Sequence, residues 1–182
     1  MTRAVVALGA NLGDREATLL AAARDLAAAE GVELVAVSPL LDTVAVRVEG
    51  EDPDAPRYLN GVALAETTLS PHALLDLLQA VEARHGRVRG ARWGDRTLDI
   101  DLILYGGRVV KDERLTVPHP RAHERDFVLS PWLALDPSAV LMGHGRVEDL
   151  LRRIGDTTRP LGGAESSGAP PSTGRAEGGE PA

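Results

Sequence analysis

The order of predicted strands and helices restricts the possible folds of this chain more than any single motif does. Apolar or alternating runs predict strands, and apolar residues at helical spacing predict helices. We expect strands at Arg3–Leu8, Val32–Ser38 (with an extension to Thr43 left open), Tyr58–Thr68 and Thr97–Tyr105, and helices at Arg15–Glu30, from Pro71 to Gly86, at Phe127–Leu135 and at Glu148–Ile154. The order strand–helix–strand–strand–helix–strand fits an α+β, ferredoxin-like sandwich: an antiparallel sheet with two main helices on one face, plus short C-terminal helices.

Cap and turn residues mark where these elements end. Asp14 is a candidate N-cap of the first helix, and Gly31 closes that helix. Ser70 and Pro71 mark the start of the second. Glycine pairs and one acidic, proline-containing stretch predict turns and a loop. These are a turn at Gly9–Gly13, a hairpin turn at Gly106–Gly107 leading into Arg108–Lys111, and a mobile loop at Val48–Arg57.

Composition indicates a single soluble domain. The chain has 182 residues, of which 43% are hydrophobic, and we expect one domain over residues 1–161. Residues 162–182 lack large apolar side chains and predict a disordered tail. With no cysteine there is neither a disulfide framework nor a thiolate zinc site. No apolar run has the length of a membrane span and no signal peptide is recognisable, so we expect a cytoplasmic protein.

The charge distribution favours a small anionic ligand. The net charge of −7 argues against a nucleic-acid binder, which usually carries a basic face. Residues 86–96 nevertheless contain four arginines and one acidic residue, a local net charge of +3. A basic patch on an acidic protein suits a ligand smaller than a polyanion.

Asp99 and Asp101 flank Ile100 in the last predicted strand. Alternation along a strand points both carboxylates the same way, where they need positive partners. A pair of Mg²⁺ ions carrying a polyphosphate would supply these, with the upstream arginines on the same phosphates. The competing interpretation is a charged, solvated sheet edge, and the segment alone does not decide between the two.

Several segments together resemble one family. GANLGDR after the first strand, YLNGV in the third, GRVRGARWGDRTLDIDLILYG and RLTVPHPR are similar to the signature of 6-hydroxymethyl-7,8-dihydropterin pyrophosphokinase, an enzyme of folate biosynthesis. The similarity covers roughly Arg3 to Ile154. It implies the ferredoxin-like fold and transfer of a diphosphate from ATP, the co-substrate, to the pterin hydroxymethyl group, with release of AMP. We expect a monomer whose partners are these small molecules, without nucleic acid or membrane.

The resemblance also implies roles for individual residues. Two Mg²⁺ ions would be held by Asp99 and Asp101, and the phosphates would be contacted by Arg87, Arg92 and Arg96. Around the nucleotide it places Gln79, Glu82, Leu102, Arg114, Thr116, His119 and Arg125. Around the pterin it places Thr43, Tyr58, Asn60, Trp93 and Phe127, with Tyr58 and Phe127 sandwiching the ring.

A few positions depart from the family pattern. Thr43-Val44-Ala45 stands where Thr-Pro-Pro is common, and the loop that follows is longer and more acidic than usual. Pro120 replaces a common tyrosine, and Ala10 a frequent serine. None of these changes touches the carboxylates or the arginines. Two alternatives rank behind this function. One is a nucleic-acid-binding module of the same fold, which the 3% aromatic content and the net charge of −7 disfavour. The other is another two-metal enzyme of the ferredoxin-like class, such as a nucleotidyl transferase.

Overall fold

The computed structural model describes residues 1–43, 45–47, 50–52, 57–86 and 97–161. A six-stranded antiparallel sheet forms its centre, in the order β12-β3-β6-β1-β7, with β2 and β3 pairing to successive parts of β6. The strands are β1 (Thr2–Ala10), β2 (Val32–Val37), β3 (Leu41–Thr43), β6 (Tyr58–Thr67), β7 (Asp99–Tyr105) and β12 (Arg159–Pro160).

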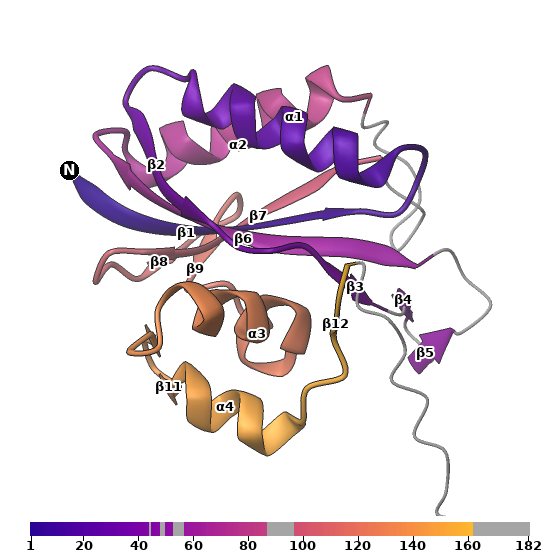
Figure 1. Ribbon diagram of the computed structural model, residues 1–182. Helices are drawn as coiled ribbons and strands as arrows, with labels where there is room; N and C mark the ends of the chain where they lie inside the picture. The colour runs from indigo at the N-terminus through magenta and orange to yellow at the C-terminus, as the bar shows by residue number, and fades with distance from the viewer. Residues whose placement is uncertain (44, 48–49, 53–56, 87–96, 162–182) are drawn as a thin grey trace, which may run out of the picture.

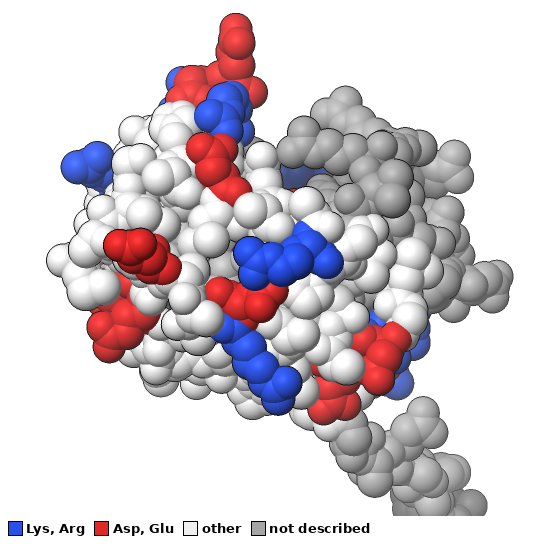
Figure 2. Space-filling model, turned by 90° about the horizontal axis from the view of Figure 1, so that it is seen from above, with Lys and Arg blue, Asp and Glu red and all other residues white. Residues whose placement is uncertain are grey.

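Helices cover both faces of this sheet (Figure 1). One face carries α1 (Arg15–Ala27) and α2 (Pro71–Arg84), and the other carries α3 (Asp126–Leu135) and α4 (Val147–Ile154). In the described part of the α1/α2 face, acidic and basic side chains are interspersed and neither sign forms a continuous area (Figure 2). Among the described residues, no helix is both long enough and apolar enough to cross a membrane.

The predicted α+β, ferredoxin-like arrangement is confirmed. The order β1-α1-β2-β3-β6-α2-β7 is strand–helix–strand–strand–helix–strand once β2 and β3 are taken as one interrupted strand. The remaining elements are two-stranded pairs and one short 3₁₀ helix. They are β4 (Ala45–Arg47) with β5 (Gly50–Asp52), β8 (Val110–Lys111) with β9 (Thr116–Val117), β10 (Val140–Leu141) with β11 (Gly145–Arg146), and η1 (Ala122–Glu124).

Two hydrophobic cores lie on opposite sides of the sheet. Beneath α1 and α2, Leu8, Leu59, Ile100 and Leu102 pack with the apolar faces of both helices. On the α3/α4 side, alternate residues of the same strands, such as Val62, pack with α3 and α4. Because side chains alternate along a regular strand, core membership identifies the face to which a neighbouring residue points wherever the ladder has no register shift.

The predicted starts of the first two helices are confirmed. The Asp14 carboxylate accepts a 3.0 Å hydrogen bond from the Ala17 N–H, and the Ser70 hydroxyl accepts a 3.2 Å bond from the Ala73 N–H. Each bond satisfies one N–H group that the first helical turn leaves without a backbone partner. The first helix ends at Ala27, before the predicted Glu30.

Two predictions about strand ends are wrong. The glycine-containing turn does not begin at Gly9, because β1 continues through Gly9 and Ala10 opposite Asn60 and Leu59. The possible extension of the second strand is instead a separate strand, β3, beyond residues 38–40. Pro39 in this gap has no N–H group to donate to a ladder.

Two predictions about loops are also wrong. The strand after Gly106–Gly107 does not fold back onto β7, because β8 pairs with β9 instead. The stretch Val48–Arg57 is not wholly a loop, since Gly50–Asp52 forms β5. The rest of that stretch up to residue 56, the arginine segment 87–96 and the predicted tail lie outside the described residues.

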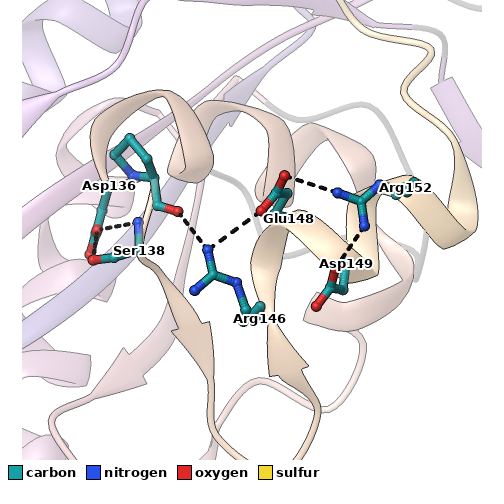
Figure 3. Close-up of polar contacts among 7 residues, drawn as sticks. Asp136, Ser138, Arg146, Glu148, Asp149 and Arg152 are labelled. Atoms are coloured by element: carbon teal, nitrogen blue, oxygen red, sulfur yellow. Dashed lines mark hydrogen bonds and ion pairs between the residues drawn. The ribbon is translucent and has the colours of Figure 1, made fainter.

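The start of α4 carries a network of exposed ion pairs (Figure 3). Arg152 bonds to Glu148 at 2.9 Å and to Asp149 at 2.7 Å, and Arg146 approaches Glu148 at 3.4 Å. Acidic residues in a first turn and basic residues in a last turn complement the helix dipole. From α4 the chain continues to β12, which joins the sheet beside β3.

Candidate active site

The carboxylates of Asp99 and Asp101 lie on the α3 side of β7. Ile100 and Leu102 between and beyond them are buried in the α1/α2 core, so alternation directs Asp99 and Asp101 to the opposite face. Both are half-buried. As the sequence predicts, the two side chains share one face, and a rigid strand paired to β1 carries them.

Asp101 lies beside two nitrogen donors from the segment between β9 and α3. Arg125 Nη1 donates a 3.1 Å hydrogen bond to Asp101 Oδ2, and His119 Nε2 lies 3.7 Å from the same oxygen. The side chains of Arg125 and His119 are only 19% and 18% exposed, against 34% for Asp101. A partly buried ion pair of this kind is screened less than one on the open surface.

His119 is held in one tautomer. Its Nδ1 accepts a 3.2 Å hydrogen bond from the Arg121 N–H, so the neutral ring carries its proton on Nε2, which faces Asp101. Burial lowers the pKa of His119 below its ordinary value, and the charge of Arg125 adds to this, while Asp101 and Asp99 oppose it. At neutral pH His119 is therefore a neutral hydrogen-bond donor at this site.

Asn60 and Thr43 form a buried polar pair on the neighbouring strands. Asn60 Nδ2 donates a 2.7 Å hydrogen bond to Thr43 Oγ1, and the two residues are only 7% and 5% exposed. This bond uses one amide proton and leaves the carbonyl oxygen of Asn60 able to accept. Tyr58, opposite Thr43 in the ladder, lies on the same face as Asn60.

One row across the sheet joins the carboxylates to this polar pair. Asp99 of β7 is opposite Gly9 of β1, and Gly9 is opposite Asn60 of β6. Two strand spacings separate Asp99 from Asn60, which is about 10 Å. A Cβ atom on Gly9 would lie 2.7 Å from Asn60 Oδ1, closer than packing allows. Because Gly9 has no side chain, no side-chain atoms project from the sheet between Asp99 and Asn60 at this position.

Phe127 lies next to Arg125 at the start of α3. The Arg125 guanidinium carbon is 5.5 Å from the centre of the Phe127 ring, a cation–π distance. The Phe127 N–H donates a 2.7 Å hydrogen bond to the Asp126 carboxylate. Arg125 thus contacts both the Asp101 carboxylate and the Phe127 ring.

The predicted nucleotide residues are spread over several elements. Gln79 and Glu82 lie on α2, and Glu82 is only 4% exposed, its Oε1 accepting a 2.7 Å hydrogen bond from the Ile100 N–H. The Leu102 side chain is packed in the α1/α2 core. Arg114 is exposed and pairs with Asp76 of α2, and Thr116 is on β9. The structure therefore brings Asp99, Asp101, His119 and Arg125 together, while Arg114 is engaged with α2.

Four members of the predicted site fall within residues 87–96. Arg87, Arg92, Trp93 and Arg96 lie outside the described residues. Conversely, the sequence prediction missed Gly9, which it assigned to a turn. The sequence feature that could have identified Gly9 is the strand YLNGV, which contains Asn60. A single sequence does not reveal the register of that strand against β1.

The donor set of β7 suits Mg²⁺ bound together with phosphate. Carboxylate oxygens are hard ligands, and Mg²⁺ is commonly bound through one or two carboxylates plus substrate phosphates. Among the described residues no three His, Asp or Glu side chains gather as a complete metal cluster. Asp99 and Asp101 thus fit a metal that the nucleotide helps to hold.

Sequence comparison gives a family model and relatives that are described by the same enzyme activity. A family model described as 7,8-dihydro-6-hydroxymethylpterin-pyrophosphokinase (HPPK) matches residues 5–137. Proteins named 2-amino-4-hydroxy-6-hydroxymethyldihydropteridine pyrophosphokinase are similar over most of their length. The one from Haemophilus influenzae is 38% identical, covering 86% of this chain and 95% of the relative. The one from Methylorubrum extorquens is 43% identical, covering 79% and 89%, and the one from Pseudomonas aeruginosa is 42% identical, covering 82% and 90%.

Solved structures share the fold at low sequence identity. Crystal structures of wild-type Plasmodium falciparum HPPK-DHPS with pteroate and with SDX-DHP superpose with TM-scores of 0.64 and 0.60, both at 13% identity and covering 84% of this chain. The chain spans only 42% and 43% of those longer chains. At this identity the similarity shows the fold alone.

Proposed function

Since the chain belongs to the 7,8-dihydro-6-hydroxymethylpterin-pyrophosphokinase family, we propose that it transfers diphosphate from ATP to the hydroxymethyl group of 6-hydroxymethyl-7,8-dihydropterin. The nucleotide product is AMP, and the reaction belongs to folate biosynthesis. The observation that supports this proposal is the row Asp99–Gly9–Asn60, in which the carboxylate proposed to bind metal and the amide proposed to bind the pterin lie two strand spacings apart on one face of the sheet.

Asp99 and Asp101 hold two Mg²⁺ ions in this proposal. When bound, the ions neutralise the charge of the polyphosphate and of the transferred group. The residues around them position the reactants, since phosphoryl transfer asks for alignment and charge stabilisation more than for covalent chemistry. Arg125 gives a fixed positive charge beside Asp101, and His119 offers its Nε2–H to a phosphate oxygen. Arg87, Arg92 and Arg96 add further positive charge from the segment before β7.

The pterin binds on the β6 side of the row. Tyr58 and Phe127 stack on its two faces, Asn60 reads its edge with the amide that Thr43 orients, and Trp93 closes over it. Stacking on rigid aromatic rings selects a flat heterocycle at low entropic cost. The nucleotide lies among Gln79, Glu82, Leu102, Arg114 and Thr116. We place the Glu82 and Leu102 side chains behind the site, because both are buried.

The working unit is residues 1–161, acting as a cytoplasmic monomer without nucleic acid or membrane. All the residues assigned above come from one chain and precede Leu161. Deletion of residues 162–182 should therefore leave turnover unchanged. Size-exclusion chromatography at micromolar concentration, with and without ATP, measures the oligomeric state.

Product analysis tests the reaction. The protein is incubated with ATP, Mg²⁺ and hydroxymethyldihydropterin, and the nucleotides are separated by chromatography. AMP and a pterin diphosphate in equal amounts support the proposal, whereas ADP alone, or no pterin-dependent product, contradicts it. Asp101→Ala should abolish turnover while its circular dichroism spectrum stays that of the wild type, and an unchanged rate would exclude Asp101 from metal binding.

A further inference from the structure

Asp42 and Arg57 form a polar pair behind the candidate pterin residues. Asp42 immediately precedes Thr43 on β3, and Arg57 immediately precedes Tyr58 at the start of β6. In the ladder Asp42 is opposite Leu59, whose side chain belongs to the α1/α2 core. Alternation therefore places Asp42 on the α1 side of the sheet, while Thr43 and Tyr58 point to the α3 side.

Arg15 joins this pair, so that three side chains form one cluster. Arg57 Nε donates a 2.9 Å hydrogen bond to Asp42 Oδ2, and Arg57 Nη2 lies 3.4 Å from the Asp42 carbonyl oxygen. Arg15, in the first turn of α1, donates a 2.7 Å hydrogen bond from Nη1 to the Arg57 carbonyl oxygen. The same Nη1 lies 3.5 Å from Asp42 Oδ1. Backbone and side chains of both strands are thus tied to α1.

The environment makes these contacts stronger than an ordinary surface ion pair. The side chains of Arg15, Asp42 and Arg57 are 30%, 28% and 37% exposed. Asp42 Oδ1 is itself buried and accepts no hydrogen bond among the described residues, so the charge of Arg15 is what compensates it. Partial burial reduces solvent screening, and Arg57 binds with more than one of its donors.

The strand that this cluster holds is short. β3 consists of three residues, and its ladder with β6 ends at the Thr43–Tyr58 pair. Thr43 in turn orients the Asn60 amide through the 2.7 Å bond. A shift of β3 relative to β6 would therefore change the Thr43 hydroxyl, the Asn60 amide and the Tyr58 ring together.

We propose that Asp42, Arg57 and Arg15 are positioning residues that set the affinity for the pterin by fixing β3 against the start of β6. They lie on the face opposite the candidate pterin residues and act on the site through Thr43 and Tyr58, with Thr43 in turn orienting the Asn60 amide. This inference rests on the proposed function, because it takes Thr43, Tyr58 and Asn60 to be the pterin contacts.

A double-mutant cycle with a matched control tests the inference. Arg57→Gln, Asp42→Asn and the double variant are compared with Arg3→Gln, Glu66→Gln and their double variant. Arg3 and Glu66 are also opposite each other, with a 3.0 Å Nε–Oε1 contact, but near the other end of β6. Loss of a cross-strand ion pair is therefore common to both sets, while the control pair is more exposed and lies far from the candidate pterin residues.

The inference predicts a specific loss of pterin affinity. Each single variant at Asp42 or Arg57 should raise the Kd and the KM for the pterin about three- to tenfold, a size that a partly buried ion pair can produce. The double variant should lose little more than either single one, and the KM for ATP should not change. In the ligand-free protein, the side-chain amide signals of Asn60 in the NMR spectrum should shift in these variants. The Arg3 and Glu66 variants should show neither effect.

The outcomes separate the inference from the proposed function. If the wild type binds the pterin and the Asp42 and Arg57 variants match it, with unchanged Asn60 signals and only a lower Tm like that of the control set, the positioning role is refuted. If the wild type does not bind the pterin, the proposed function fails. The Asn60 signals then still decide whether the pair orients that amide, and unshifted signals overturn the inference.

Discussion

Glu82 Oε1 accepts a 2.7 Å hydrogen bond from the backbone N–H of Ile100, the residue between Asp99 and Asp101. Glu82 is on α2 and only 4% exposed, so a buried carboxylate of one layer is bonded directly to the strand that carries both candidate metal ligands. A buried N–H group that loses its acceptor carries the full cost of its desolvation. The position of β7 relative to α2 therefore depends on this contact.

Two replacements of Glu82 should show how much its hydrogen bond to the Ile100 N–H contributes. Glu82→Gln keeps an oxygen acceptor for the Ile100 N–H, whereas Glu82→Leu leaves that N–H unsatisfied at a cost of about 1–3 kcal/mol. We expect the Gln variant to stay near wild-type stability, and the Leu variant to lose stability and to require more Mg²⁺ for half-maximal activity. Urea unfolding and Mg²⁺ titrations measure both quantities. Equal behaviour of the two variants would show that the bond to Ile100 does not hold the strand.

Gly9 should be sensitive to a single methyl group. In Gly9→Ala the new Cβ would lie 2.7 Å from Asn60 Oδ1, so the amide must move from the position in which it bonds to Thr43. We expect the Kd for the pterin to rise about tenfold or more, as one lost hydrogen bond produces, with little change in the KM for ATP. Pterin fluorescence measures the binding.

Gly107→Ala is the matched control for this change. A Cβ at Gly107 has nothing within 4 Å, and Gly107 is not among the glycines with positive φ. This variant should bind the pterin as the wild type does. If Gly9→Ala also binds normally, the space above Gly9 is not part of the pterin site.

Replacement of Arg125 should affect catalysis more than folding. Arg125→Lys keeps the positive charge but loses the planar guanidinium that contacts both Asp101 and the Phe127 ring. We expect kcat to fall by about 10²-fold, the size found when one electrostatic donor is removed from an active site. Steady-state kinetics measure it, with Arg121→Lys as a control because Arg121 is exposed and pairs with Glu124. An Arg125→Lys enzyme with full kcat would remove Arg125 from the reaction.

Acidification should destabilise the metal-free protein through His119. Its pKa in the folded state lies below the ordinary value of 6.5, chiefly because of burial, so the unfolded chain binds more protons between the two values. Stability conferred by the neutral ring is therefore fully present above pH 6.5 and declines as the pH falls from 6.5 toward the folded-state pKa. The difference in unfolding free energy between wild type and His119→Gln should shrink over this window. NMR titration of the ring gives the pKa directly, and a value above 6.5 would contradict this prediction.

Much of the fold was predictable because it depends on local pattern. The periodicity of Leu74, Leu78 and Val81, with Ser70 and Pro71 before them, indicates the second helix at its correct start. The alternation around Ile100 likewise gives the shared direction of Asp99 and Asp101. These features follow from neighbouring residues and need no tertiary information.

The parts that failed or were missed depend on register between distant segments. Whether the strand after Gly106–Gly107 pairs with β7 or with β9 depends on partners that no local pattern identifies. Gly9 is interpretable only once Asp99 and Asn60 are known to be its neighbours on either side. The contact of Arg125 with Asp101 joins two segments whose proximity only the folded chain shows.

A crystal structure of the ternary complex, with a non-hydrolysable ATP analogue, Mg²⁺ and hydroxymethyldihydropterin, tests the central claim most directly. It should show Mg²⁺ about 2.1 Å from carboxylate oxygens of Asp99 and Asp101. The pterin edge should lie within hydrogen-bond distance of Asn60, and its hydroxymethyl oxygen should lie above Gly9, facing the phosphates. A complex in which neither aspartate contacts a metal, or in which the pterin lies away from Asn60, would contradict the account.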